Sequence, residues 1–125
     1  GGSTLEALRV YDIAVTLNGH VYVATNGGLQ KWNGAAWSAA TGLPQAPTIA
    51  LATDRSSNPG AIYVGTTTHG VYVSRDDGAT WTPFNEGLGN LYVTELEISN
   101  GATKTLHAGT AYGGVWSIDI SSTAQ

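Results

Sequence analysis

The stretch that decides the fold is Ser74-Arg75-Asp76-Asp77-Gly78-Ala79-Thr80-Trp81, because its residue types make sense together only as a hairpin corner. Asp76 has a short carboxylate that can accept backbone N–H groups across the turn. Gly78 can adopt the positive φ that a tight corner requires, and Trp81 starts the next strand with a large apolar anchor. The stretch therefore predicts two antiparallel strands joined at this corner.

The same eight residues resemble the Asp-box, also called the BNR repeat, whose pattern is Ser/Thr-x-Asp-x-Gly-x-Thr-Trp. All five defining positions match, at Ser74, Asp76, Gly78, Thr80 and Trp81. In that family the Asp-box is a structural corner on the rim of a β-propeller, found in sialidases, xyloglucan-degrading hydrolases, photosystem assembly factors and sorting receptors. The resemblance implies a structural role for the five residues and a propeller fold, and it implies no particular activity.

Three segments repeat at about 40 to 45 residues, which is the period of a four-stranded propeller blade. They align with one threonine in register, at Thr25, Thr66 and Thr110, separated by 41 and 44 residues. An alternating apolar run precedes each segment, at 13–17, 49–53 and 94–98. Alternation of this kind is typical of strands with one buried face. The chain is therefore predicted to contain three copies of one supersecondary unit.

We expect an all-β fold, in which the whole chain forms a single partial β-propeller of four-stranded antiparallel blades that is completed by oligomerisation. The first blade covers about 11–39, with strands near 11–17, 20–25, 28–32 and 36–39. The second covers about 48–84, with strands near 48–53, 61–66, 70–75 and 80–84. The third covers about 92–120, with strands near 92–98, 105–110 and 114–120, and lacks its last strand. Residues 3–9 are the candidate donor of that strand.

Three blades are too few to close a ring, because propellers close with about four to eight. Repeat architectures bury their cores only by stacking on neighbours. We therefore expect the chain to associate with itself, either as a homodimer forming a six-blade ring or as an open head-to-tail filament. In the donor-strand hypothesis, Thr4 to Leu8 of one copy pairs with the strand near Val115 to Ile118 of another.

Composition and charge exclude several partners. The formal net charge is −4, and the five lysines and arginines are scattered over different loops and turns, so we expect no nucleic acid. No apolar run is long enough to span a bilayer and no signal peptide is recognisable, so we expect no membrane association. The chain contains no cysteine, which excludes disulfides and thiolate metal sites. The family resemblance favours an extracellular or secreted protein.

The charged residues do not form a recognisable catalytic pattern. Sialidases of the resembling family need three arginines that converge on one carboxylate, whereas Arg9, Arg55 and Arg75 fall in separate parts of the repeat. Glu95 and Glu97 share one strand face at positions i and i+2. Glycoside hydrolysis requires paired carboxylates, but a solvated strand face is the favoured interpretation of this pair. We predict no catalytic residue.

The three histidines fall in non-equivalent positions of the repeat, at His20, His69 and His107. No two of them have a spacing typical of metal ligands. We therefore predict no metal site and no cofactor.

The candidate ligand-binding residues lie on the loops that join strand B to C and strand D to the next A, which gather on one face of a propeller. They are Tyr11, Asn26, His69, Asn85, Tyr92 and Tyr112. Aromatic rings beside amides and hydroxyls suit glycan or protein recognition. The alternative for Tyr11 and Tyr92 is packing between blades.

Two functions remain open at this stage. The favoured one is a non-catalytic, self-assembling propeller module that binds a glycan or a protein on the loop face. The alternative is a fragment of an Asp-box glycoside hydrolase that is active only when assembled. The first is favoured because no acid, base or nucleophile constellation is recognisable in the sequence.

Overall fold

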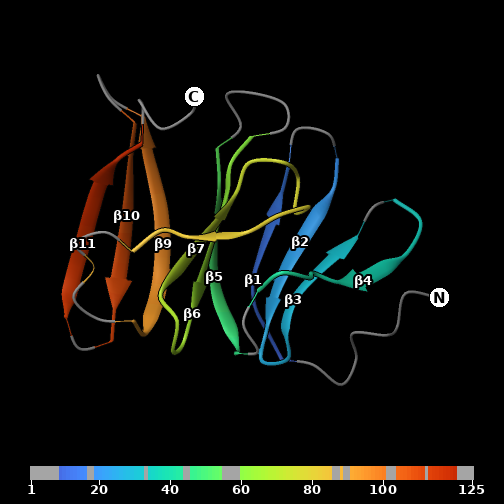
Figure 1. Cartoon of the computed structure of the whole chain (residues 1–125), viewed down its shortest axis with the longest axis horizontal. Helices are drawn as coiled ribbons and strands as arrows, with labels where there is room; N and C mark the ends of the chain where they lie inside the picture. Colours follow the sequence, from blue (N-terminus) through green and yellow to red (C-terminus); the bar gives the residue numbers. More distant parts are fainter. Residues whose placement is uncertain are drawn as a thin grey trace.

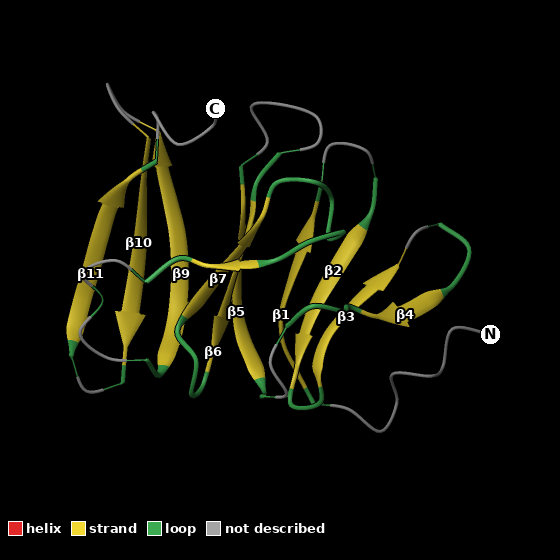
Figure 2. Cartoon of the chain, viewed as in Figure 1, coloured by secondary structure: helices red, strands yellow, loops and turns green. Residues whose placement is uncertain are grey.

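The computed structural model describes residues 9–16, 19–32, 34–43, 46–54, 60–85, 88, 91–100, 104–111 and 113–120. These residues form eleven strands and no helix (Figures 1 and 2). The strands make three separate antiparallel sheets. The expectation of an all-β fold built from three small antiparallel sheets is therefore confirmed. None of the described segments is a helix long and apolar enough to cross a membrane.

Each sheet follows the order of its strands along the chain. The first contains β1 (Val10–Val15), β2 (Val21–Thr25), β3 (Gly28–Trp32) and β4 (Trp37–Ala39). The second contains β5 (Thr48–Thr53), β6 (Ile62–Thr66), β7 (Val71–Ser74) and β8 (Thr82–Pro83). The third contains β9 (Val93–Asn100), β10 (Lys104–Thr110) and β11 (Gly114–Asp119). The eleven strands expected within the three repeats are present, with ends shifted by a residue or two.

The three sheets lie side by side, with the second between the other two (Figure 1). Neighbouring sheets meet at their first strands, because β5 contacts both β1 and β9. Each of these first strands also carries a β-bulge or register shift near its start. The first strand of each repeat therefore lies where neighbouring sheets meet.

The repeated threonine has one role in all three sheets, which explains its register. Its hydroxyl donates to a carbonyl across the turn that follows, from Thr25 to Gly28 at 2.6 Å, from Thr66 to Gly70 at 2.9 Å and from Thr110 to Gly114 at 3.0 Å. The same oxygen accepts a backbone N–H from Gly27, His69 and Gly113 respectively. A hydroxyl that both donates and accepts thus fixes each turn.

Two apolar clusters fill the spaces between the sheets. The junction of the first and second sheets buries Tyr22, Ala24, Leu29, Leu51, Ile62, Val64 and Trp81. The junction of the second and third sheets buries Ala50, Ala52, Tyr63, Val71, Val73, Val93, Leu96, Leu106, Ala108 and Ile120. The second sheet is thus covered on both faces, which explains why its strands β5 and β6 are apolar almost throughout.

The third sheet differs from the others in its strand count. Among the described residues, β11 pairs with β10 alone, so its other edge has no strand beside it. Of the candidate donor strand 3–9, only Arg9 belongs to the described residues. The donor-strand hypothesis therefore stays a prediction.

Candidate functional site

The corner at residues 74–81 is held by a carboxylate, as expected. Asp76 Oδ1 accepts the backbone N–H of Thr80 at 2.9 Å, and Oδ2 accepts the Thr80 hydroxyl at 2.5 Å. Ser74 Oγ donates to Asp76 Oδ1 at 2.8 Å and accepts the N–H of Gly78 at 2.8 Å. Gly78 has φ +87°, and Trp81 is buried just before β8. The carboxylate of Asp76 and the positive φ of Gly78 thus hold this corner, and the side chain of Trp81 anchors its far end in the apolar cluster.

These hydrogen bonds favour the charged form of Asp76. The side-chain bond from Thr80 contributes most, followed by the backbone bond from Thr80 and the bond from Ser74, and together they lower the pKa of Asp76 to about 2. Hydrogen bonds donated to a carboxylate stabilise its charged form and occupy its acceptor positions. Asp76 is thus committed to the corner and is not free for proton transfer near neutral pH.

The adjacent Asp77 has a different role, because it reaches across to the first sheet. Its backbone has φ 60°, a left-handed conformation that aspartate tolerates better than most residues. Asp77 Oδ2 lies 2.7 Å from His20 Nδ1, and Oδ1 lies 2.8 Å from the Tyr22 hydroxyl. Lys31 Nζ donates to the carbonyl oxygen of Asp77 at 2.8 Å and lies 3.6 Å from Oδ2. We call these four residues the Asp77 cluster.

Burial strengthens the interactions of the Asp77 cluster. Tyr22 is fully buried, and its ring contacts Trp81 edge to face with the centroids 6.5 Å apart. Lys31 Nζ also lies over the Tyr22 ring, 5.6 Å from its centroid. Burial, and secondarily the hydrogen bond to Asp77, raises the pKa of Tyr22 far above its usual value. The tyrosine therefore stays neutral and acts as a hydrogen-bond donor that joins two sheets.

The contacts of Asp77 with His20 and Tyr22 were not predicted from the sequence. The Asp-Asp-Gly order at 76–78 is a local signal, since an aspartate before the glycine can adopt the left-handed conformation. The partners could not be found in the same way. Tyr22 and His20 lie 55 and 57 residues away in the sequence, and only the packing of the first sheet on the second brings them to the corner.

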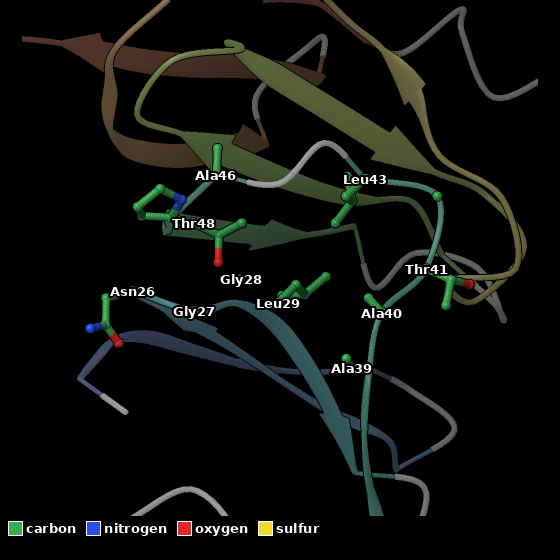
Figure 3. Close-up of a pocket in the computed structure, with 12 residues that line it drawn as sticks. Asn26, Gly27, Gly28, Leu29, Ala39, Ala40, Thr41, Leu43, Ala46 and Thr48 are labelled. Carbon is green, nitrogen blue, oxygen red and sulfur yellow. The ribbon is translucent and has the colours of Figure 1, made fainter. Parts of the chain in front are cut away.

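A cavity of about 480 Å³ lies between the first sheet and the segment that leads into β5. It is lined by Asn26, Gly27, Gly28, Leu29, Ala39, Ala40, Thr41, Gly42, Leu43, Ala46, Pro47 and Thr48 (Figure 3). Its described lining carries no charge and no aromatic ring. Thr48 links the walls, because its hydroxyl accepts the N–H of Thr25 at 3.2 Å. The cavity therefore offers amide, hydroxyl and apolar surface to a neutral molecule.

Trp81 approaches the same region from the second sheet. A Cβ added at Gly42 would lie 3.6 Å from Cδ1 of its indole, so glycine leaves room for the ring there. The adjacent Nε1 is buried and has no hydrogen-bond partner in the part of the chain that the structure describes. The indole thus packs near Gly42, which lines the cavity, and makes no polar contact with the described residues.

The candidate ligand-binding residues occupy several places. Asn26 lines the cavity, and its Oδ1 accepts the backbone N–H of Arg9 at 2.9 Å. Asn85 and His69 lie together on the loops of the second repeat, where Asn85 Nδ2 donates to the His69 carbonyl at 3.3 Å and Oδ1 accepts the N–H of Val71 at 2.7 Å. The Asn85 side chain therefore clamps the turn before β7.

The candidate tyrosines lie elsewhere. Tyr11 is 46 % exposed on β1 and Tyr92 is 39 % exposed just before β9, whereas Tyr112 lies outside the described residues. The backbone carbonyl of Tyr92 accepts the N–H of Ala111 at 2.9 Å. Neither Tyr11 nor Tyr92 belongs to the lining of the cavity.

The remaining titratable groups do not assemble into a metal centre. Within the described ranges, no three histidine, aspartate or glutamate side chains come together as a metal site would require. His107 lies between two hydroxyls, with Nε2 2.9 Å from Ser99 Oγ and Nδ1 2.8 Å from Ser117 Oγ. This arrangement sits on an exposed sheet face rather than in a cavity.

Comparison with known protein-family models and with curated proteins gave no match for this chain. We therefore infer its function from its own contacts, exposed faces and cavity.

Proposed function

We propose that this chain is a non-catalytic, self-assembling module in which the three sheets are blades of a β-propeller. The repeated threonine turns, the repeated strand order and the central position of β1, β5 and β9 support the blade assignment. The Asp-box resemblance at Ser74–Trp81 supports it independently, since its corner geometry is present. Assembly of such blades proceeds by covering one blade face with another.

The observation that carries the proposal is an exposed apolar sheet face. On β1, Ile13 is 60 % exposed and Val15 is 42 % exposed, although both belong to a strand of a well-formed four-stranded sheet. Contiguous apolar surface of this kind marks an interaction site on a soluble protein.

The test is the mass of the protein in solution. Sedimentation velocity or light scattering from about 1 to 100 μM should show a dimer or a larger species that dissociates on dilution. A monomer over the whole range would overturn the proposal. Deletion of residues 1–8 tests the donor-strand route separately: loss of assembly would support it, and an unchanged mass would exclude it.

We further propose that ligand binding occurs at the cavity beside Asn26. Its neutral lining, with the Asn26 amide and the Thr41 hydroxyl, suits an uncharged glycan or a peptide main chain. A panel of neutral oligosaccharides and short uncharged peptides, titrated by NMR, should shift resonances of Gly27, Gly28 and Thr48. An Asn26→Ala variant should lose these shifts while keeping its fold.

The glycoside hydrolase alternative receives less support from the geometry. Glu95 and Glu97 are exposed on the free face of the third sheet, away from the cavity. Glycoside hydrolysis requires two carboxylates that flank one bond in a substrate site. The described residues near the cavity include no carboxylate, so we do not extend the proposal to catalysis.

A further inference from the structure

The two end sheets expose faces of different chemistry. The free face of the first sheet is the one turned away from the second sheet, and the cross-strand register gives its rows. Its large apolar members are Ile13 and Val15, which are exposed, Val21, Trp32 and Trp37, which are half-buried, and Val23, which is buried. Gln30 and Ala39 complete the two rows. None of these eight side chains is charged, and the Trp32 and Trp37 rings contact each other with centroids 5.4 Å apart.

The free face of the third sheet is polar. Its rows are Glu97, His107 and Ser117 in the centre, with Glu95, Gly109 and Val115 on one side and Ser99, Thr105 and Asp119 on the other. Three of these nine residues are carboxylates, and all three are exposed. Val115, at 74 % exposure, is the one large apolar residue of the face. No lysine or arginine belongs to these rows.

Charge separates the three ways in which two copies can join these faces. Joining the first-sheet face to the third-sheet face buries Glu95 and Glu97 against a surface that offers no cation, and uncompensated burial of charge is unfavourable. Joining two third-sheet faces brings six carboxylates together. Joining two first-sheet faces buries apolar rows and no charge.

We infer that the partner of the free first-sheet face is the same face of a second copy, giving a two-fold symmetric, back-to-back dimer. This inference rests on the proposed self-assembly and specifies its interface. A two-fold contact places the same patch on both copies, so a largely apolar patch without charge is complementary to itself. The third sheet then acts as a terminal cap, with the polar outer face that end repeats of stacked proteins need for solubility.

The inference departs from the ring and the filament expected from the sequence. Both of those assemblies join unlike ends, so the first sheet of one copy would meet the third sheet of another. The donor-strand arrangement joins the same unlike ends. A back-to-back dimer joins like ends and leaves both third sheets in solvent.

A matched pair of substitutions tests which faces meet. Ile13→Lys and Val115→Lys each place an ammonium at an exposed β-branched position, on the first and third sheets respectively. Ile13→Lys should raise the dissociation constant measured by sedimentation at least about tenfold, because two lysines would enter one apolar interface. Val115→Lys should leave the constant within about twofold. Weakening by Val115→Lys would contradict the inference, since it would show that the third-sheet face takes part.

Single-cysteine variants give a second measurement, because the chain contains no cysteine of its own. With a short bis-maleimide, Ile13→Cys should cross-link to itself, and Val115→Cys should not. Cross-linking that appears only when the two variants are mixed would show contact between unlike ends and overturn the inference while leaving self-assembly intact. A wild-type protein that is monomeric at all concentrations would instead overturn the proposed function, and the inference with it.

Discussion

The two junctions between the sheets use different chemistry, although the repeats on either side share the same turns. Between the first and second sheets, an apolar cluster is combined with the Asp77 cluster and borders the 480 Å³ cavity. Between the second and third sheets, a larger set of buried residues is extended by an aromatic series, Tyr63, Phe84 and Trp116. Lys104 and Asp54 form an ion pair across this second junction, with Nζ and Oδ2 3.0 Å apart.

The two junctions should therefore contribute differently to the stability of the protein and to the orientation of its sheets. Apolar contacts are non-directional and scale with buried area, so the second junction should dominate the unfolding free energy. Hydrogen bonds to a buried tyrosine and a carboxylate are directional. The first junction should therefore fix the angle between its sheets and the shape of the cavity beside it.

The largest effect is expected from a cavity made in the second junction. Leu106 is fully buried there, and Leu106→Ala should lower the unfolding free energy by about 2–5 kcal/mol. Urea denaturation followed by circular dichroism measures this difference. Val115→Ala, in the same sheet but largely exposed, is the control and should change it by less than about 0.5 kcal/mol. Equal effects of the two variants would show that this junction is not packed as described.

A smaller effect is expected in the first junction. Tyr22→Phe keeps the ring but removes the hydroxyl that donates to Oδ1 and to the carbonyl of Asp77. It should cost about 1–3 kcal/mol because the partly buried Oδ1 loses this donor, while the carbonyl keeps Lys31. Tyr11→Phe, at a half-exposed position, is the matched control and should be nearly neutral. If both variants were neutral, the Asp77 cluster would contribute no net stability.

The same tyrosine should make the stability of the first junction decrease at alkaline pH. The pKa of Tyr22 is raised in the folded protein, so its contribution is present below the unfolded value of 10.0 and is lost as pH rises above that value. In an absorbance titration, Tyr22 should ionise only above its ordinary pKa and together with unfolding. The Tyr22→Phe variant should lack this late step. Ionisation of all tyrosines near pH 10 with the fold intact would contradict the burial argument.

The sequence was sufficient for the features that depend on local residues and on the repeat. The period of Thr25, Thr66 and Thr110 located all three sheets, because each threonine stabilises its own turn within four residues. The corner at Asp76 was predictable for the same reason. The contacts of Asp77 and the pairing of Asn85 with the turn at His69 were not, since they join residues from different elements. The contrast between the free end faces was visible only once cross-strand register assigned each side chain to a face.

The ion pair of the second junction should contribute less than either cluster. Lys104 Nζ lies 3.1 and 3.0 Å from the two oxygens of Asp54, and both side chains keep partial exposure. Lys104→Met retains the aliphatic stem and should cost about 1 kcal/mol, at the upper end for accessible ion pairs. The cost should fall in 1 M salt, where such pairs are screened. A loss comparable to that of Leu106→Ala would show that the second junction depends on charge as the first does.

The smallest effect is expected from Asp76, which stabilises the corner without crossing a junction. Its pKa is lowered to about 2 by the hydrogen bonds from Thr80 and Ser74, so the charged form is the one that the folded protein favours. That stability is present above the unfolded value of 3.8 and is lost as pH falls through the folded value near 2. Asp76→Asn should therefore flatten the pH dependence of unfolding between about pH 4 and 2. If Asp76→Asn also removed the late ionisation step of Tyr22, the corner and the first junction would act as one unit, and the separation between Asp76 and Asp77 argued above would be wrong.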